Sequence, residues 1–98
     1  MDKKDRELLD WDKAERAADV LRAVAHPVRL KIIELLSGGE MTVTQIQEAL
    51  GTTQSMTSQQ LSLMKSRGIL KSRRNGKSVH YCVERPEVVH VIKCLRES

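Results

Sequence analysis

The chain has 98 residues, 40% of them hydrophobic and 31% charged, and its formal net charge is +4. These values fit one folded domain and exclude a disordered chain. No apolar run approaches the roughly 20 residues that span a bilayer, and the charged N-terminus leads into no apolar signal segment, so we expect a cytoplasmic protein without a membrane partner.

The first part of the chain predicts two helices. Residues 5–25 carry Leu and Ala at helical spacing, without Pro or Gly, and should form the first helix. Pro27 suits the first turn of the second helix, because its missing N–H is not needed there. That helix should run to Leu36 and end at Ser37-Gly38-Gly39, and its dense apolar content places it at the centre of the fold.

Two shorter helices are expected next, over residues 43–50 and 54–67. Thr42 or Thr44 can cap the first of them, and Gly51 stops it. The spacing of the second helix predicts which of its side chains face the core: Thr57, Leu61 and Met64.

The hydrophobic period then changes from helical to alternating. Residues 69–74 and 77–83 flank Asn75-Gly76, and this dipeptide between two alternating runs is a strong signal for a β-hairpin. Pro86 opens a last helix that should reach Leu95.

The predicted order is α-α-(short β)-α-α-β-β-α, a mostly α fold with a small β-hairpin. Two short helices joined by a tight turn and followed by a basic hairpin describe a winged helix-turn-helix. We expect a single domain over residues 1–98, with the helix-turn-helix at 43–67 and the wing at 69–83. A chain this short gains burial by dimerising.

The charges are distributed unevenly along the chain. From residue 41 to residue 60 the only charged side chain is Glu48, whereas residues 61–98 hold nine basic and three acidic ones. A basic block beside a neutral polar segment suits a surface that binds a polyanion, although a solvated basic face has the same composition.

The outward face of the 54–67 helix carries hydroxyls and amides but no acid. These groups are suitable donors and acceptors for base edges in a major groove, and the basic hairpin is suited to phosphates. The alternatives are a polar linking helix and a charged edge strand that prevents sheet-to-sheet pairing. The candidate DNA-binding residues in this region are Gln54, Ser55, Ser58, Gln59, Ser62, Lys65, Arg73, Arg74 and Lys77.

Three stretches resemble the ArsR/SmtB-type bacterial repressors. Residues 23–36, AVAHPVRLKIIELL, look like the family signature around the second helix. Residues 53–70, TQSMTSQQLSLMKSRGIL, are similar to its recognition helix, and residues 73–81, RRNGKSVHY, to its wing. Two positions depart from the family pattern, because Thr57 stands where Val is usual and Gln60 where His is common.

The resemblance implies a homodimer that binds an imperfect inverted repeat in operator DNA and leaves it when an effector binds. It implies that the terminal helices, residues 5–25 and 86–96, form the dimer interface, although ordinary packing within one chain would produce the same apolar stripes. It also adds Thr42 and Thr44 to the DNA contacts, at a helix start whose N–H groups can hold a phosphate.

The chain departs from the family's metal-ligand patterns. Thr42-Val43-Thr44 stands where one type carries Cys-Val-Cys, and hydroxyls are poor ligands for soft metals. His90 and Cys94, four residues apart, are a candidate pair of metal ligands, with burial in an interface as the alternative. Cys82 and Cys94 are candidates for a thiol switch. We predict no cofactor, and the effector is unassigned.

The sequence thus predicts a DNA-binding transcriptional regulator that acts as a dimeric repressor. The alternatives are a winged-helix module that binds another protein and a thiol-based redox sensor variant of the repressor. The sequence argues against an enzyme, since it has no nucleophile–base set, Gly-rich phosphate loop or paired carboxylates in plausible positions.

Overall fold

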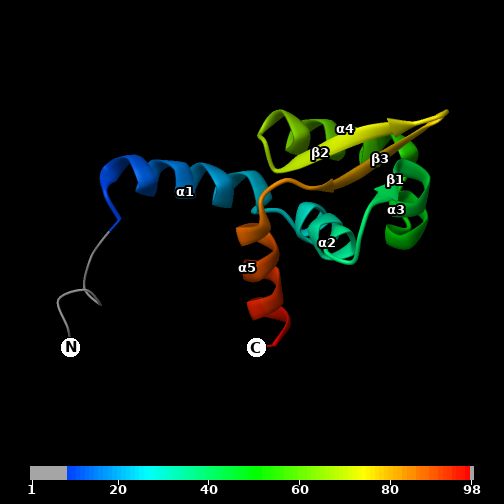
Figure 1. Cartoon of the computed structure of the whole chain (residues 1–98). Coiled ribbons are helices and arrows are strands. Elements are labelled where there is room, and N and C mark those ends of the chain that lie inside the picture. The colour runs from blue at the N-terminus through cyan, green and yellow to red at the C-terminus, as the bar shows by residue number, and fades with distance from the viewer. Residues whose placement is uncertain (1–8, 98) are drawn as a thin grey trace.

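The computed structural model describes residues 9–97 (Figure 1). Its elements follow the predicted order, which confirms a mostly helical fold with a small antiparallel sheet. The elements are α1 (Trp11–Val24), α2 (Pro27–Leu36), β1 (Met41–Thr42), α3 (Val43–Leu50), α4 (Gln54–Ser66), β2 (Leu70–Asn75), β3 (Ser78–Val83) and α5 (Pro86–Arg96).

Helix α1 begins later than predicted. The Asp10 carboxylate accepts a hydrogen bond from the Lys13 N–H at 2.8 Å, so Asp10 is the N-cap and Leu9 lies outside the helix. Asp is a preferred N-cap because its side chain supplies a partner for an N–H of the first turn. The remaining part of the predicted first helix, residues 5–8, lies outside the described residues.

Helix α2 lies at the centre of the fold, as predicted. Its N-cap is His26, whose ring Nδ1 accepts a hydrogen bond from the Val28 N–H at 3.2 Å, and Pro27 follows in the first turn. Ile32 and Ile33 of this helix have no exposed surface. Helix α2 contacts α3, α4, β3 and α5.

Helices α3 and α4 form the helix-turn-helix. Thr42, rather than Thr44, caps α3 in a capping box shared with Gln45. Gly51 ends α3 with a φ of 69°, a left-handed conformation that glycine adopts without strain. Helix α4 ends one residue earlier than predicted, because Arg67 is its C-cap.

The hairpin turn lies one residue beyond the predicted position. Asn75 pairs with Ser78, so the turn residues are Gly76 and Lys77 instead of Asn75 and Gly76. Of these two, only Gly76 has a positive φ, 64°, and glycine at the first turn position is the pattern of a II′ hairpin. Strand β3 lies in the middle of the sheet, between β2 and the short β1.

One aliphatic core joins the helices to the sheet, as the composition requires. The inward side predicted for α4 is confirmed, since Thr57, Leu61 and Met64 are all buried. The buried hydrophobic residues are Ala23, Val24, Ile32, Ile33, Leu36, Ile46, Leu61, Met64, Ile69, Leu70, Val88 and Ile92.

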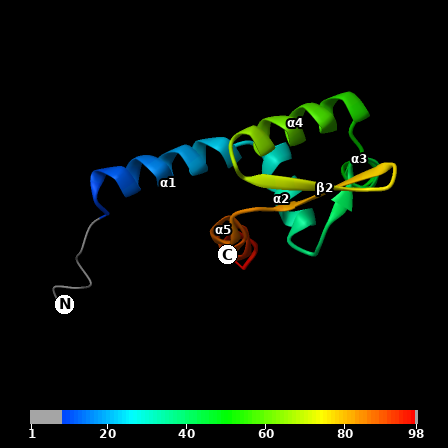
Figure 2. The same ribbon diagram turned by 45° about the horizontal axis from the view of Figure 1, so that its top comes forward.

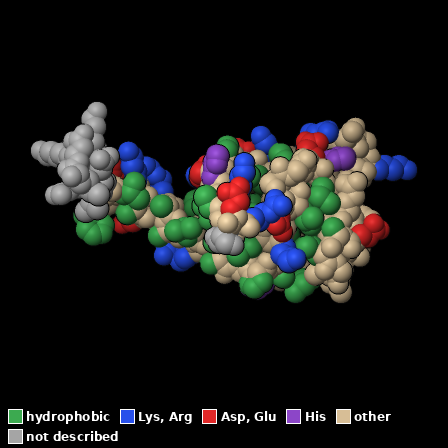
Figure 3. All heavy atoms as spheres, turned by 90° about the horizontal axis from the view of Figure 1, so that it is seen from below, with side chains coloured by type: hydrophobic (Ala, Val, Ile, Leu, Met, Phe, Trp, Pro, Cys, Tyr) green, Lys and Arg blue, Asp and Glu red, His purple; other side chains and the backbone are tan. Residues whose placement is uncertain are grey.

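Helix α1 projects from this body, and the principal extents of the molecule are 53 × 28 × 21 Å (Figure 1). Figure 3 shows apolar side chains along the projecting helix and on the adjoining body. None of the helices in the described part of the chain is long and apolar enough to cross a membrane. The exposed large hydrophobic residues of α1 and α5 are Trp11, Leu21, Val91 and Leu95.

Candidate nucleic-acid interface

Helix α4 presents the polar face that the sequence predicts. Its buried stripe turns the opposite side outward, where Ser55, Gln59 and Ser62 are exposed and Ser58 is half-buried. The side chain of Thr53 caps the helix by accepting from the Met56 N–H at 3.1 Å. The N-terminal turn is thus fixed, which gives the outward side chains a defined direction.

The buried hydroxyl of Thr57 explains one departure from the family pattern. Thr57 is 1% exposed, and its Oγ1 donates to the Thr53 carbonyl at 2.8 Å. The same Oγ1 shares a hydrogen bond with the Thr52 hydroxyl at 2.7 Å. A threonine is tolerated in the core here because its polar atom is satisfied.

The start of α3 holds the two threonines that the resemblance added. The Thr42 hydroxyl is half-buried and accepts from the Gln45 N–H at 3.2 Å, so it serves the helix cap. Thr44, in the first turn, is exposed. Of the two hydroxyls, that of Thr44 is the more accessible to a phosphate.

The two arginines of the wing point to opposite faces of the hairpin, because side chains alternate along a strand. Arg73 is held by Glu40: its Nε donates at 2.8 and 3.0 Å to the two carboxylate oxygens, and its Nη2 donates at 2.6 Å. These hydrogen bonds hold the pKa of Glu40 below its usual range and raise the pKa of Arg73. Arg73 therefore has a fixed partner within the fold.

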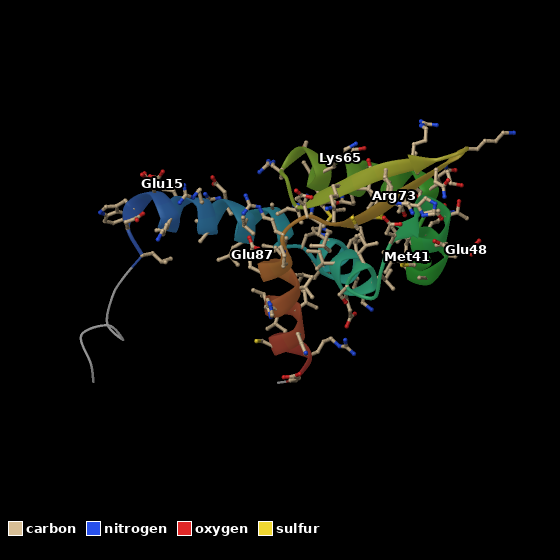
Figure 4. All side chains as sticks on the ribbon, in the orientation of Figure 1. Glu15, Met41, Glu48, Lys65, Arg73 and Glu87 are labelled. Atoms are coloured by element: carbon tan, nitrogen blue, oxygen red, sulfur yellow. The ribbon has the colours of Figure 1, made fainter. Side chains whose placement is uncertain are left out.

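Arg74 and Lys77, near the tip of the hairpin, are exposed. Neither forms an ion pair with an acid in residues 9–97. Nitrogen-tipped side chains project from this end of the molecule in Figure 4, away from the body. The tip of the wing thus carries available positive charge.

Lys65 connects the wing to the recognition helix. Its Nζ donates to the Ser72 hydroxyl on β2 at 2.8 Å, so the two elements lie side by side (Figure 4). From residue 41 to residue 83 the chain has one acid, Glu48, and it lies on α3 rather than on α4 or the hairpin. A polyanion approaching α4 and the wing meets little repulsion.

Two of the three residues proposed for effector sensing, His90 and Cys94, lie apart from this face, whereas Cys82 lies within the wing. Cys82 is half-buried on β3, and His90 and Cys94 are exposed on α5. Over residues 9–97 no group of three or more His, Cys, Asp or Glu side chains is placed to hold a metal ion. The described part of the chain therefore brings no third ligand to His90 and Cys94.

Two residues of the site were missed by the sequence reasoning. Glu40 precedes β1, and its partner Arg73 lies 33 positions away. Arg29 of α2 donates to the Gln60 side chain of α4, 31 positions away. The only signal for Glu40 was its place as the last acid before a long acid-poor segment.

Two short helices, the second with an acid-free polar face, and a cationic hairpin beside it define a winged helix-turn-helix protein. The family model of bacterial regulatory proteins, arsR family, matches residues 26–72. The transcriptional repressor PagR of Bacillus anthracis is 38% identical over 88 residues, which are 89% of this chain and 88% of PagR. This chain therefore belongs to the arsR family and is a DNA-binding transcriptional repressor, not an enzyme.

Other relatives agree with this assignment. The biofilm growth-associated repressor of Xylella fastidiosa (strain Temecula1 / ATCC 700964) is 31% identical over 85% of this chain and 73% of its own length. The crystal structure of PagR superposes with a TM-score of 0.79, covering 88% of this chain and 99% of PagR at 38% identity. The homodimeric winged helix-turn-helix DNA-binding domain of Mb0332 from Mycobacterium bovis superposes with a TM-score of 0.74 at 29% identity, covering 92% of this chain and 85% of that domain.

Proposed function

We propose that two copies of this chain bind an inverted-repeat operator, each reading one half-site with the outward face of α4. The observation that carries this proposal is the row of exposed Ser and Gln side chains on an acid-free helix beside a cationic wing. Gln can bond adenine through two hydrogen bonds, and Ser can serve as donor or acceptor to either base of a pair. The base-reading residues are Gln54, Ser55, Ser58, Gln59 and Ser62.

Phosphate contacts would come from residues on both sides of α4. Lys65 lies at the wing side of the helix, and Arg74 and Lys77 extend from the hairpin. Thr42 and Thr44 sit at the start of α3, where N–H groups attract a phosphate. Arg73 is a weaker candidate for a phosphate contact, because Glu40 already neutralises it.

The dimer interface in this proposal consists of α1 and α5. Trp11 is 84% exposed and Leu21 is 53% exposed on α1, and Leu95 is 58% exposed on α5. Exposed apolar patches of this kind mark interaction sites, and the Mb0332 domain, which is similar to this chain, is homodimeric. A dimer would act on DNA in the bacterial cytoplasm.

The single tryptophan makes the dimer directly testable. Trp11 should leave water when two copies associate, so diluting the protein should shift its fluorescence to longer wavelength as dimers dissociate. Leu21→Glu should give a monomer by sedimentation while leaving the thermal unfolding of the body in place. A monomeric wild type at high micromolar concentration would contradict the dimer.

Operator reading is tested by fluorescence anisotropy with an inverted repeat from the region upstream of the gene. Specific binding should survive competitor DNA and weaken as salt rises, because bound counterions are released. Replacing Ser58 and Gln59 together with alanine should remove the preference for the operator and leave salt-dependent binding to random DNA. Ser37→Ala, at the C-cap of α2, is the matched control. Equal binding of operator and random DNA by the wild type would refute base reading, and absence of DNA binding would favour a protein-binding module.

Release from the operator by a thiol oxidant is the effector mechanism to test first, because Cys82 lies on β3 of the wing and Cys94 lies on the proposed dimerisation helix α5. Diamide, which takes two electrons and two protons from a pair of thiols, would form a disulfide and lower operator affinity. Cys82→Ser and Cys94→Ser should each abolish the response if the two thiols pair with each other. An unchanged wild-type affinity after oxidation would refute a thiol switch.

A further inference from the structure

Arg29 joins three helices through one guanidinium group. It lies in α2, half-buried, and its Nε donates to Oε1 of Gln60 on α4 at 2.8 Å. Its Nη1 donates to the backbone carbonyl of Ala23 on α1 at 3.3 Å. In Figure 2, α4 and the C-terminal end of α1 lie next to α2, so one side chain of α2 can contact both.

The carbonyl of Ala23 needs a donor from outside its helix. The residue four positions further on is Pro27, which has no N–H, and the chain has already left the helical conformation at Ala25. Ala23 itself is only 5% exposed. A buried carbonyl without a partner is costly, so Arg29 supplies a hydrogen bond that the backbone does not.

Gln60 lies on the flank of α4, between the buried stripe and the outward face. It directly follows Ser58 and Gln59 in the chain, both proposed base-reading residues. Unlike those two, Gln60 uses its amide oxygen inside the protein, on Arg29. The Gln60 side chain is therefore occupied by a contact that links α4 to α2 and, through Arg29, to α1. It is not available to bond a base.

We propose that Arg29 is a positioning residue, which fixes the direction of the recognition helix α4 relative to the dimerisation helix α1. The proposal rests on the proposed function, in which α1 belongs to the dimer interface and α4 reads DNA. A guanidinium is planar and rigid, so donors at its two ends hold two acceptors at a set separation. When α1 moves within the dimer, the two hydrogen bonds of Arg29 should move α4 with it. An effector that shifts α1 could in this way change the direction of the recognition helix.

The geometry predicts a specific phenotype. A misdirected α4 in each protomer still recognises one half-site, but the two recognition helices of a dimer no longer match the spacing of the two half-sites. Loss of the Arg29–Gln60 hydrogen bond should therefore weaken binding to the full inverted repeat far more than binding to a duplex that carries one half-site. A residue that only stabilised the fold would weaken both equally.

The first test uses Gln60→Met, which removes the acceptor, keeps the length of the side chain and leaves the bond from Arg29 to Ala23 in place. We expect full-site affinity to fall by about tenfold and half-site affinity to stay within about twofold of wild type. Adding or removing one base pair between the half-sites should lower the full-site affinity of this variant less than that of the wild type. Gln60→His, which restores a ring nitrogen as acceptor, should recover most of the full-site affinity.

Arg29→Lys is the second test, because a lysine keeps the charge but not the two-ended donor. The Trp11 dilution curve and the thermal midpoint verify that each variant dimerises and folds. Equal losses on full and half sites, or an unchanged preference for spacing in Gln60→Met, would overturn the positioning role. A wild type that does not distinguish operator from random DNA would instead refute the proposed function, so the two failures are distinguishable.

Discussion

Glu40→Ala should strengthen the binding of DNA and make it more dependent on salt. Glu40 engages Arg73 of the wing through three hydrogen bonds between 2.6 and 3.0 Å. Without the carboxylate, the Nε and Nη2 donors of Arg73 become available to a phosphate. The wild-type fold thus withholds one cation of the wing from DNA.

The size of the effect follows from counterion release. One new phosphate contact in each protomer makes two in a dimer, and each contributes about −0.9 to the slope of log affinity against log salt. The slope should therefore steepen by about 1.8, equivalent to at most about 60-fold in affinity at 0.1 M salt. The gain should be similar on operator and random DNA, because phosphate contacts carry no base information, so the relative preference for the operator should not rise.

The assay is anisotropy at four or more salt concentrations, with Glu48→Ala as the matched control. Both substitutions remove one negative charge from a chain of formal net charge +4, but Glu48 forms no ion pair within residues 9–97. Glu48→Ala should change affinity only through the overall field. Equal slopes for the two variants would show that net charge, and not the release of Arg73, is responsible, and the reasoning would fail.

Three further predictions concern stability. His26→Ala should lower the free energy of unfolding by about 1 kcal/mol, while His26→Asn keeps it, because Asn also accepts at an N-cap; urea denaturation checks this, and equal loss in both would refute the capping role. Thr57→Val should change that free energy by less than about 1 kcal/mol, and Thr57→Ala should cost more, since it also leaves a cavity. The hydrogen bonds from Arg73 lower the pKa of Glu40, so the ion pair stabilises the fold at neutral pH and this stabilisation is lost as the pH falls below the ordinary Glu range. Glu40→Ala should therefore flatten the acid side of a plot of the free energy of unfolding against pH. Identical plots for the variant and the wild type would contradict this prediction.

The order of elements was predictable because the relevant signals are local. Spacing of apolar residues predicted α2, α3 and α4 with boundaries within about a residue, and the inward set of α4 followed from the same period. The exact ends were decided by competition between neighbours. Asp10 caps α1 in place of continuing it, and Gly76 takes the first turn position because it alone of the turn pair adopts a positive φ.

The contacts that orient the site were not predictable from local signals. Glu40 and Arg73 meet across 33 positions, and Arg29 and Gln60 across 31. Neither pair has a spacing rule, because such contacts depend on how whole elements pack. The sequence thus predicts a set of candidate DNA-binding residues, while the structure distinguishes Arg73, which is held by Glu40, from Arg74, which forms no ion pair within residues 9–97.

The Glu40–Arg73 and Arg29–Gln60 contacts affect DNA binding in different ways, so the effects of removing them should add independently. Glu40 limits the charge that the wing offers to phosphates, and Arg29 sets the direction of α4. The pairs share no residue, and contacts without shared partners are usually additive. The double variant Glu40→Ala/Gln60→Met should show the steep salt slope of the first substitution and the relaxed half-site spacing of the second. A slope that depends on the residue at position 60 would mean that the wing and the recognition helix move as one unit, and Lys65, which bonds Ser72 across that junction, would be the next residue to replace.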